Sequence, residues 1–77
     1  MKELIEQIAM KLVDYPEQVS VTEVEGENST VLELRVAKSD LGKVIGKEGR
    51  IAKAMRVLLS AATSRGQKKH TLEIIDD

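Results

Sequence analysis

Glycines and basic residues alternate with aliphatic ones in the stretch LGKVIGKEGRI, residues 41–51. A glycine lets a ligand approach the main chain closely, because it carries no Cβ atom. Lysine and arginine form charge-assisted hydrogen bonds to phosphate oxygens. The combination leaves three interpretations open: a phosphate-binding loop for a nucleotide, a plain turn, or a site that holds a nucleic-acid backbone.

Nucleotide-binding motifs do not fit this stretch. A P-loop needs four residues between its first glycine and the Gly-Lys pair, followed by Ser or Thr. Here three residues separate Gly42 from Gly46, and Glu48 occupies the position of the hydroxyl. The dinucleotide motif G-x-G-x-x-G does not match Gly42, Gly46 and Gly49 either. A nucleotide-binding enzyme is therefore the weakest alternative.

A G-x-x-G motif remains, made of Gly46, Lys47, Glu48 and Gly49. As a plain turn between two helices, it would use glycine only for its positive φ. That interpretation does not account for the cations that crowd the segment, with only Glu48 opposing them. These cations are Lys43, Lys47, Arg50, Lys53 and Arg56. An anionic backbone lying on the motif accounts for them, and the N–H groups that open the following helix would also favour an anion there.

The charge of the chain supports this interpretation once it is divided along the sequence. The net charge is only −1. Residues 1–37 carry three basic and eight acidic side chains, whereas residues 38–77 carry nine basic and five acidic ones. The positive half contains the glycine-rich stretch. A local basic patch matters more for anion binding than the overall charge does.

Hydrophobic periodicity predicts how the segments around the motif fold. The predicted elements are a helix over 2–13, strands over 19–24 and 32–36, a short helix over 41–45, a longer helix over 49–64, and a strand over 71–75. Turn residues 26–29 should join the first two strands into an antiparallel hairpin. Ser39 and Asp40 are suitable N-caps for the short helix, and Gly66 for the end of the long one. We therefore expect one α+β domain over residues 1–77, with a three-stranded sheet and its helices on one face.

The run IGKEGRIAKAMR, residues 45–56, resembles the I-G-x-x-G-x-x-I signature of KH domains. The predicted element order is similar to the type II, prokaryotic KH arrangement. A chain of this length containing LGKVIGKEGRIAKAMRVLL also resembles the KhpA family of small bacterial RNA-binding proteins. The resemblance implies that the G-x-x-G loop clamps single-stranded RNA, since KH domains hold about four nucleotides in this way.

Carried over to this sequence, the resemblance makes Gly46 and Gly49 the clamp and makes Lys47 and Arg50 the phosphate contacts. The full candidate RNA-binding set is Lys43, Val44, Ile45, Gly46, Lys47, Glu48, Gly49, Arg50, Ile51 and Lys53. Glu48 departs from what such a site would choose, because an acid opposes phosphate by a few tenths of a kcal/mol or more at an exposed position.

Aromatic stacking cannot contribute to this binding, because Tyr15 is the single aromatic residue of the chain. RRM and cold-shock modules rely on aromatic platforms for their bases, so those folds are excluded. Bases would instead lie against aliphatic side chains, for which the candidates are Val36, Val44, Ile45 and Ile51. Weak binding with little sequence preference is the expected consequence.

The long predicted helix is apolar on more than one side. One stripe consists of Ile51, Met55, Leu58 and Ala62, and a second of Ala54, Val57 and Ala61, with Leu59 beside it. Deep burial of the helix is one interpretation. The other is self-association, because a three-stranded sheet is too small to cover both stripes. The candidate dimer interface consists of Ala54, Val57, Leu58 and Ala61. The resemblance implies a homodimer or a pairing with a larger KH-containing RNA-binding protein.

Other chemistry finds little support in the sequence. The chain has no cysteine and one histidine, His70, so we predict neither a metal site nor a cofactor. Its serines show no sign of a catalytic triad, and we expect a protein that is not an enzyme. We also expect no secretion signal and no membrane span, hence a cytoplasmic location. The resemblance further implies an RNA chaperone or post-transcriptional regulator linked to cell-wall homeostasis and cell shape. The rival interpretation is a KH-fold interaction or dimerisation module with little RNA binding of its own.

Overall fold

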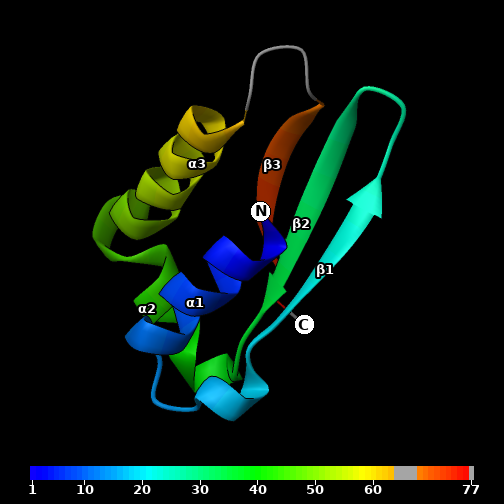
Figure 1. The fold of residues 1–77 in the computed structure, drawn as a ribbon. Helices are drawn as coiled ribbons and strands as arrows, with labels where there is room; N and C mark the ends of the chain where they lie inside the picture. Colours follow the sequence, from blue (N-terminus) through cyan, green and yellow to red (C-terminus); the bar gives the residue numbers. More distant parts are fainter. Residues whose placement is uncertain (64–67, 77) are drawn as a thin grey trace.

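The computed structural model describes residues 1–63 and 68–76 of the chain. In this part, helices α1, α2 and α3 lie on one face of a three-stranded sheet (Figure 1). The elements are α1 (Lys2–Leu12), η1 (Pro16–Gln18), β1 (Ser20–Glu25), β2 (Ser29–Arg35), η2 (Lys38–Asp40), α2 (Leu41–Ile45), η3 (Lys47–Gly49), α3 (Arg50–Ala62) and β3 (Lys69–Ile74). The predicted α+β fold and its order αββααβ are confirmed.

The sheet has the strand order β1-β2-β3. Strands β1 and β2 form the predicted antiparallel hairpin, closed by a hydrogen bond of 2.7 Å from the Gly26 N–H to the Ser29 carbonyl. Strand β3 runs parallel to β2, because α2 and α3 carry the chain back across the helical layer before β3 begins. Strand β3 therefore forms one edge of the sheet, beside α3 (Figure 1).

The hydrophobic core lies between the sheet and the helices. The predicted alternation in β2 is confirmed: Leu32 and Leu34 are buried, whereas Glu33 and Arg35 face the other side. The remaining core side chains are Ile5, Ala9, Val21, Val44, Met55, Leu59 and Leu72. Since α2 contributes Val44 and α3 contributes Met55 and Leu59, the core also fixes the two helices that flank the G-x-x-G motif.

The buried side of helix α3 includes Met55 and the partly buried Ile51 from the first predicted stripe, whereas the second stripe is exposed. Ala52, Met55 and Leu59 face the core, whereas Leu58 is about half exposed. The spacing of three and four residues between these buried positions places them on one side of a helix. Leu58 precedes Leu59 by one residue and is therefore rotated away from Leu59 by about 100°. The expected helix over 49–64 extends over Arg50–Ala62 in the structure, and the predicted cap at Gly66 lies outside the described residues.

Within residues 1–63 and 68–76, no helix combines the length and apolar character that crossing a membrane would require.

Candidate nucleic-acid interface

The segment at residues 46–49, called here the GxxG loop, joins α2 to α3 through a single turn of 3-10 helix. Gly46 ends α2 with φ 78° and ψ 169°, and Gly49 precedes α3 with φ 74° and ψ 17°. Both conformations favour glycine, and the first is almost restricted to it. A Cβ atom on Gly46 would also lie 2.6 Å from Cγ1 of Ile51. The turn geometry by itself therefore requires glycine at position 46 and favours it at position 49.

Glu48 has a left-handed backbone as well, with φ 59°. This conformation costs an ordinary residue roughly 1–2 kcal/mol. Its carboxylate lies 3.5 Å from Nη2 of Arg50, and both side chains are mostly exposed. An exposed ion pair of this kind contributes little to stability, because water screens it. A phosphate could therefore replace Glu48 as the partner of Arg50 at little cost.

The predicted cations fall into two groups. Lys47, Arg50 and Lys53 are exposed on the GxxG loop and on the first turns of α3. Lys43 lies on α2, and its ammonium donates hydrogen bonds of 2.8 Å to Asp14 and 3.3 Å to Asp40. The first group can meet an approaching anion directly, whereas Lys43 is already engaged by two carboxylates.

The predicted aliphatic contacts also divide. Ile45 is 38% exposed at the end of α2, while Ile51 and Val36 are partly buried against the core. Val44 has no exposed surface, because its side chain points from α2 into the core. The prediction that Val44 contacts a base is therefore wrong in this structure. Among Val44, Ile45 and Ile51, Ile45 has the largest exposed fraction beside the GxxG loop.

A groove that the sequence did not predict lies between α3 and β3. Its volume is about 310 Å³, and it is lined by Arg56, Ser60, Lys69, His70, Thr71 and Leu72. Arg56 spans it, since its Nε and Nη2 each donate to the Leu72 carbonyl over 3.4 Å. Gly49, Lys53, Arg56 and Ser60 share one face of α3, because they are spaced by four, three and four residues. This face connects the GxxG loop with the groove.

The sequence shows the polar strip of α3, but it does not show that β3 lies beside this strip. Lys53, Arg56 and Ser60 recur at helical spacing in an otherwise apolar helix. Only the parallel placement of β3 beside β2 puts Lys69 and His70 opposite that strip. An edge strand also presents backbone N–H and C=O groups to whatever lies beside it.

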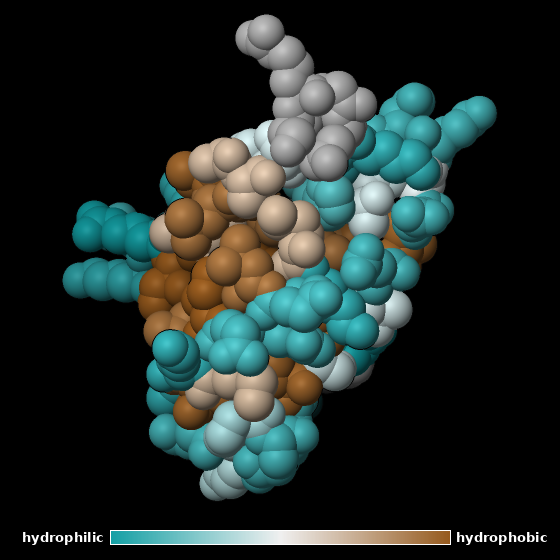
Figure 2. Space-filling model, in the orientation of Figure 1, coloured by the Kyte–Doolittle hydropathy of each residue, from teal (hydrophilic) through white to brown (hydrophobic). Residues whose placement is uncertain are grey.

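The exposed apolar side of α3 forms a continuous hydrophobic area (Figure 2). All four residues of the predicted dimer interface, Ala54, Val57, Leu58 and Ala61, are exposed. Val57 is 67% exposed and Leu58 47%. The face is available for a partner, and its use as an interface stays a prediction.

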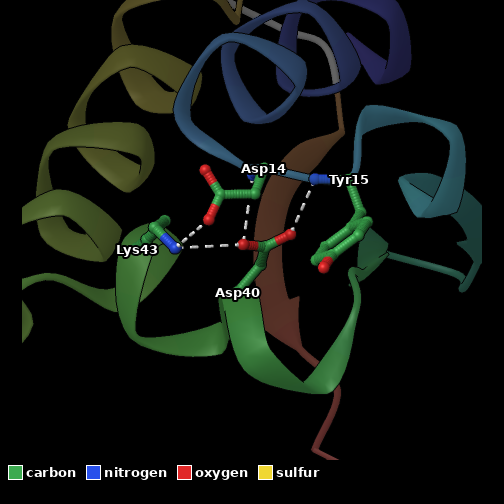
Figure 3. Close-up of polar contacts among 4 residues, drawn as sticks. All are labelled: Asp14, Tyr15, Asp40 and Lys43. Carbon is green, nitrogen blue, oxygen red and sulfur yellow. Dashed lines mark hydrogen bonds and ion pairs between the residues drawn. The ribbon is translucent and has the colours of Figure 1, made fainter.

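A polar cluster at the beginning of α2, at the opposite end from the GxxG loop, consists of Asp14, Tyr15, Asp40 and Lys43 (Figure 3). The Asp40 carboxylate accepts hydrogen bonds of 3.1 Å from the backbone N–H groups of Asp14 and Tyr15. Burial raises the pKa of Asp40, but these N–H groups and the Lys43 ammonium outweigh it, so the net pKa lies below its usual value. The hydrogen bonds to Asp14 and then Asp40 raise the pKa of Lys43 against its desolvation. Both groups are therefore held in their charged forms.

The order αββααβ, with the GxxG loop between the second and third helices, defines a type II KH domain. A family model described as "KhpA/KhpB, KH domain" matches residues 2–74, and the chain belongs to this family. The family expected from the G-x-x-G segment is thereby confirmed.

Curated relatives are similar over nearly their whole length. The RNA-binding protein KhpA of Clostridium perfringens is 59% identical over 97% of this chain and 100% of its own length. The RNA-binding protein KhpA of Clostridium acetobutylicum is 56% identical over the same shares. That of Treponema pallidum is 56% identical over 97% of this chain and 94% of its own. No solved structure matches the chain.

Proposed function

We propose that this protein binds single-stranded RNA by holding its sugar-phosphate backbone on the GxxG loop. The observation that carries the proposal is the turn at Gly46 and Gly49, which holds Lys47 and Arg50 exposed next to the first N–H groups of α3. These N–H groups and the helix dipole favour a phosphate at this end of α3. The relatives named as RNA-binding proteins support the same activity.

The bound strand would run from the GxxG loop into the groove between α3 and β3. Phosphates would contact Lys47, Arg50 and Lys53, and a base would lie against Ile45. Further bases would lie between Arg56 and the edge of β3, where Lys69 adds positive charge. Without aromatic platforms, affinity would depend mainly on the backbone, so binding would be weak and tolerant of sequence.

The test is the double variant Lys47→Asp with Glu48→Asp, which replaces the cation of the GxxG loop by an acid and keeps its glycines. RNA crosslinking should be lost, with the fold and the mass in solution unchanged. Lys11→Asp is the control, because it changes the net charge equally at an exposed position of α1. Unaltered crosslinking in the double variant would refute the clamp.

Salt dependence gives a second measurement on the unmodified protein. If the strand makes three or four phosphate contacts, the logarithm of affinity should fall with the logarithm of salt at a slope of about −2 to −3. An affinity independent of salt would contradict a backbone clamp.

The protein would also associate with a second KH domain through the exposed face of α3, as a homodimer or with a larger KH-containing partner. The exposed Val57 and Leu58 support this part, since neighbouring apolar side chains at the surface mark interaction sites. Val57→Glu should lower the mass in solution to that of a monomer. Val24→Glu, at an exposed valine of β1, should not.

The rival function is an interaction module with little RNA binding. It would be favoured if Val57→Glu separated the protomers while the double variant Lys47→Asp with Glu48→Asp left RNA crosslinking unaltered. A role as RNA chaperone or post-transcriptional regulator, in the cytoplasm and connected with cell wall and cell shape, stays a prediction from the family resemblance. Sequencing the RNA that crosslinks to the protein in cells would test it.

A further inference from the structure

A buried carboxylate connects two elements that lie far apart in the sequence. Asp40 has no exposed surface. Its Oδ1 accepts from the Asp14 N–H and its Oδ2 from the Tyr15 N–H, so it holds the chain just beyond the end of α1. Figure 3 shows the Lys43 ammonium directed at the carboxylates of both Asp14 and Asp40. The cluster thus joins the end of α1 to the beginning of α2.

Asp40 occupies the N-cap position of α2 but does not cap it with its side chain. The sequence suggested the usual local role, in which the carboxylate accepts an N–H from its own helix. In the structure, the carboxylate accepts N–H groups from the segment after α1 instead. A buried charge requires such partners, because desolvation would otherwise be costly. Its hydrogen bonds therefore constrain the position of α2, not its helical conformation.

This constraint matters for the GxxG loop because α2 is short. A helix of five residues is not stable by itself and takes its position from its contacts. Val44 anchors its middle in the core, the Asp40 cluster anchors its beginning, and Gly46 at its end opens the GxxG loop. A rotation of α2 about Val44 would move Gly46 relative to the first turn of α3.

We propose that Asp40 is a positioning residue for RNA binding, which orients α2 so that the GxxG loop meets the first turn of α3 at the geometry a backbone requires. The inference rests on the proposed RNA-binding function. Lys43 belongs to the same polar cluster as the counter-ion of Asp40 and Asp14, and it makes no phosphate contact. The site on the RNA side is thus formed by Lys47, Arg50 and Lys53.

The first experiment compares Asp40→Asn with Val21→Ala. Asparagine keeps the shape of Asp40 but lacks its charge and one acceptor, while Val21→Ala removes core volume in β1, away from α2. RNA affinity is measured at a temperature where both variants are folded. We expect Asp40→Asn to weaken binding about threefold or more, and Val21→Ala to leave it within about twofold. Equal affinities in the two folded variants would overturn the positioning role.

The second experiment uses milder variants and the salt slope, and it stands even if Asp40→Asn does not fold. Lys47→Met should make the slope shallower by about 0.7, the value for one phosphate on a single strand. Lys43→Met should leave the slope unchanged while the Gly46 and Gly49 amide resonances shift. A shallower slope for Lys43→Met, or unmoved resonances, would overturn the assignment of Lys43. A failure of the unmodified protein to bind RNA would instead refute the proposed function.

Discussion

An ion pair of a carboxylate and a basic side chain lies near each end of α2, and the two carboxylates differ in their exposure to solvent. At its beginning, Asp40 is fully buried and is bonded to Lys43 and to backbone N–H groups from another element. Just beyond its end, Glu48 and Arg50 form a pair 3.5 Å apart with both side chains mostly exposed. Burial decides what each pair does: the first holds two elements together, whereas the second can exchange its partner for a phosphate.

Gly46→Ala should cause the largest loss of stability. The backbone at Gly46 lies in a region almost restricted to glycine, and a Cβ atom would meet Ile51 at 2.6 Å. We expect a loss of about 2–3 kcal/mol in the free energy of unfolding, measured by urea denaturation. A loss below about 1 kcal/mol would show that the turn relaxes easily.

Asp40→Asn should change the acid sensitivity of the fold. The folded pKa of Asp40 lies below its usual value of 3.8, so its carboxylate stabilises the fold above pH 3.8. That contribution to stability is lost as the pH falls further, through the folded pKa of Asp40. The Asp14 N–H and the Lys43 ammonium are among the groups that contact this carboxylate. Urea unfolding between pH 7 and pH 2 should therefore show a flatter acid limb for Asp40→Asn, from a lower plateau. An acid limb as steep as that of the unmodified protein would contradict this account.

Glu48→Gly should improve both the fold and the site. Glycine adopts a positive φ without the penalty that Glu48 carries, so the free energy of unfolding should rise by about 1 kcal/mol. Removing the acid should also tighten RNA binding by a few tenths of a kcal/mol, since the negative charge at the exposed loop is lost. Thermal unfolding and RNA titration measure the two effects. Tighter binding without added stability would show that the backbone is not strained at this position.

Gly42→Ala should give a smaller gain in stability. A Cβ atom at Gly42 would meet nothing within 4 Å outside the backbone of its own helix. Alanine favours a helix over glycine by roughly 0.5–1 kcal/mol, so α2 should become more stable between its two charged ends. Thermal unfolding checks this expectation. A loss of stability would reveal a contact that the open space around Gly42 does not suggest.

Local sequence signals predicted much of this protein correctly. Helix α2 has the predicted bounds, the β1–β2 hairpin forms where turn residues separate the two predicted strands, and Gly46 and Gly49 have the positive φ expected of a turn. Each of these features depends on residues within a few positions of one another, because backbone conformation and hydrophobic periodicity are local properties. The motif that identified the family is local in the same sense.

The tertiary structure alone decided which side chains the site can use. Asp40 looked like a helix cap, but its backbone partners lie 25 and 26 positions away. The burial of Val44, the engagement of Lys43 by Asp14, and the groove between Arg56 and β3 all depend on how separate elements pack. The sequence by itself therefore determined the turn and the charges that surround it. Packing decided which of those charges face solvent, because burial and long-range hydrogen bonds depend on elements that meet only in the folded chain.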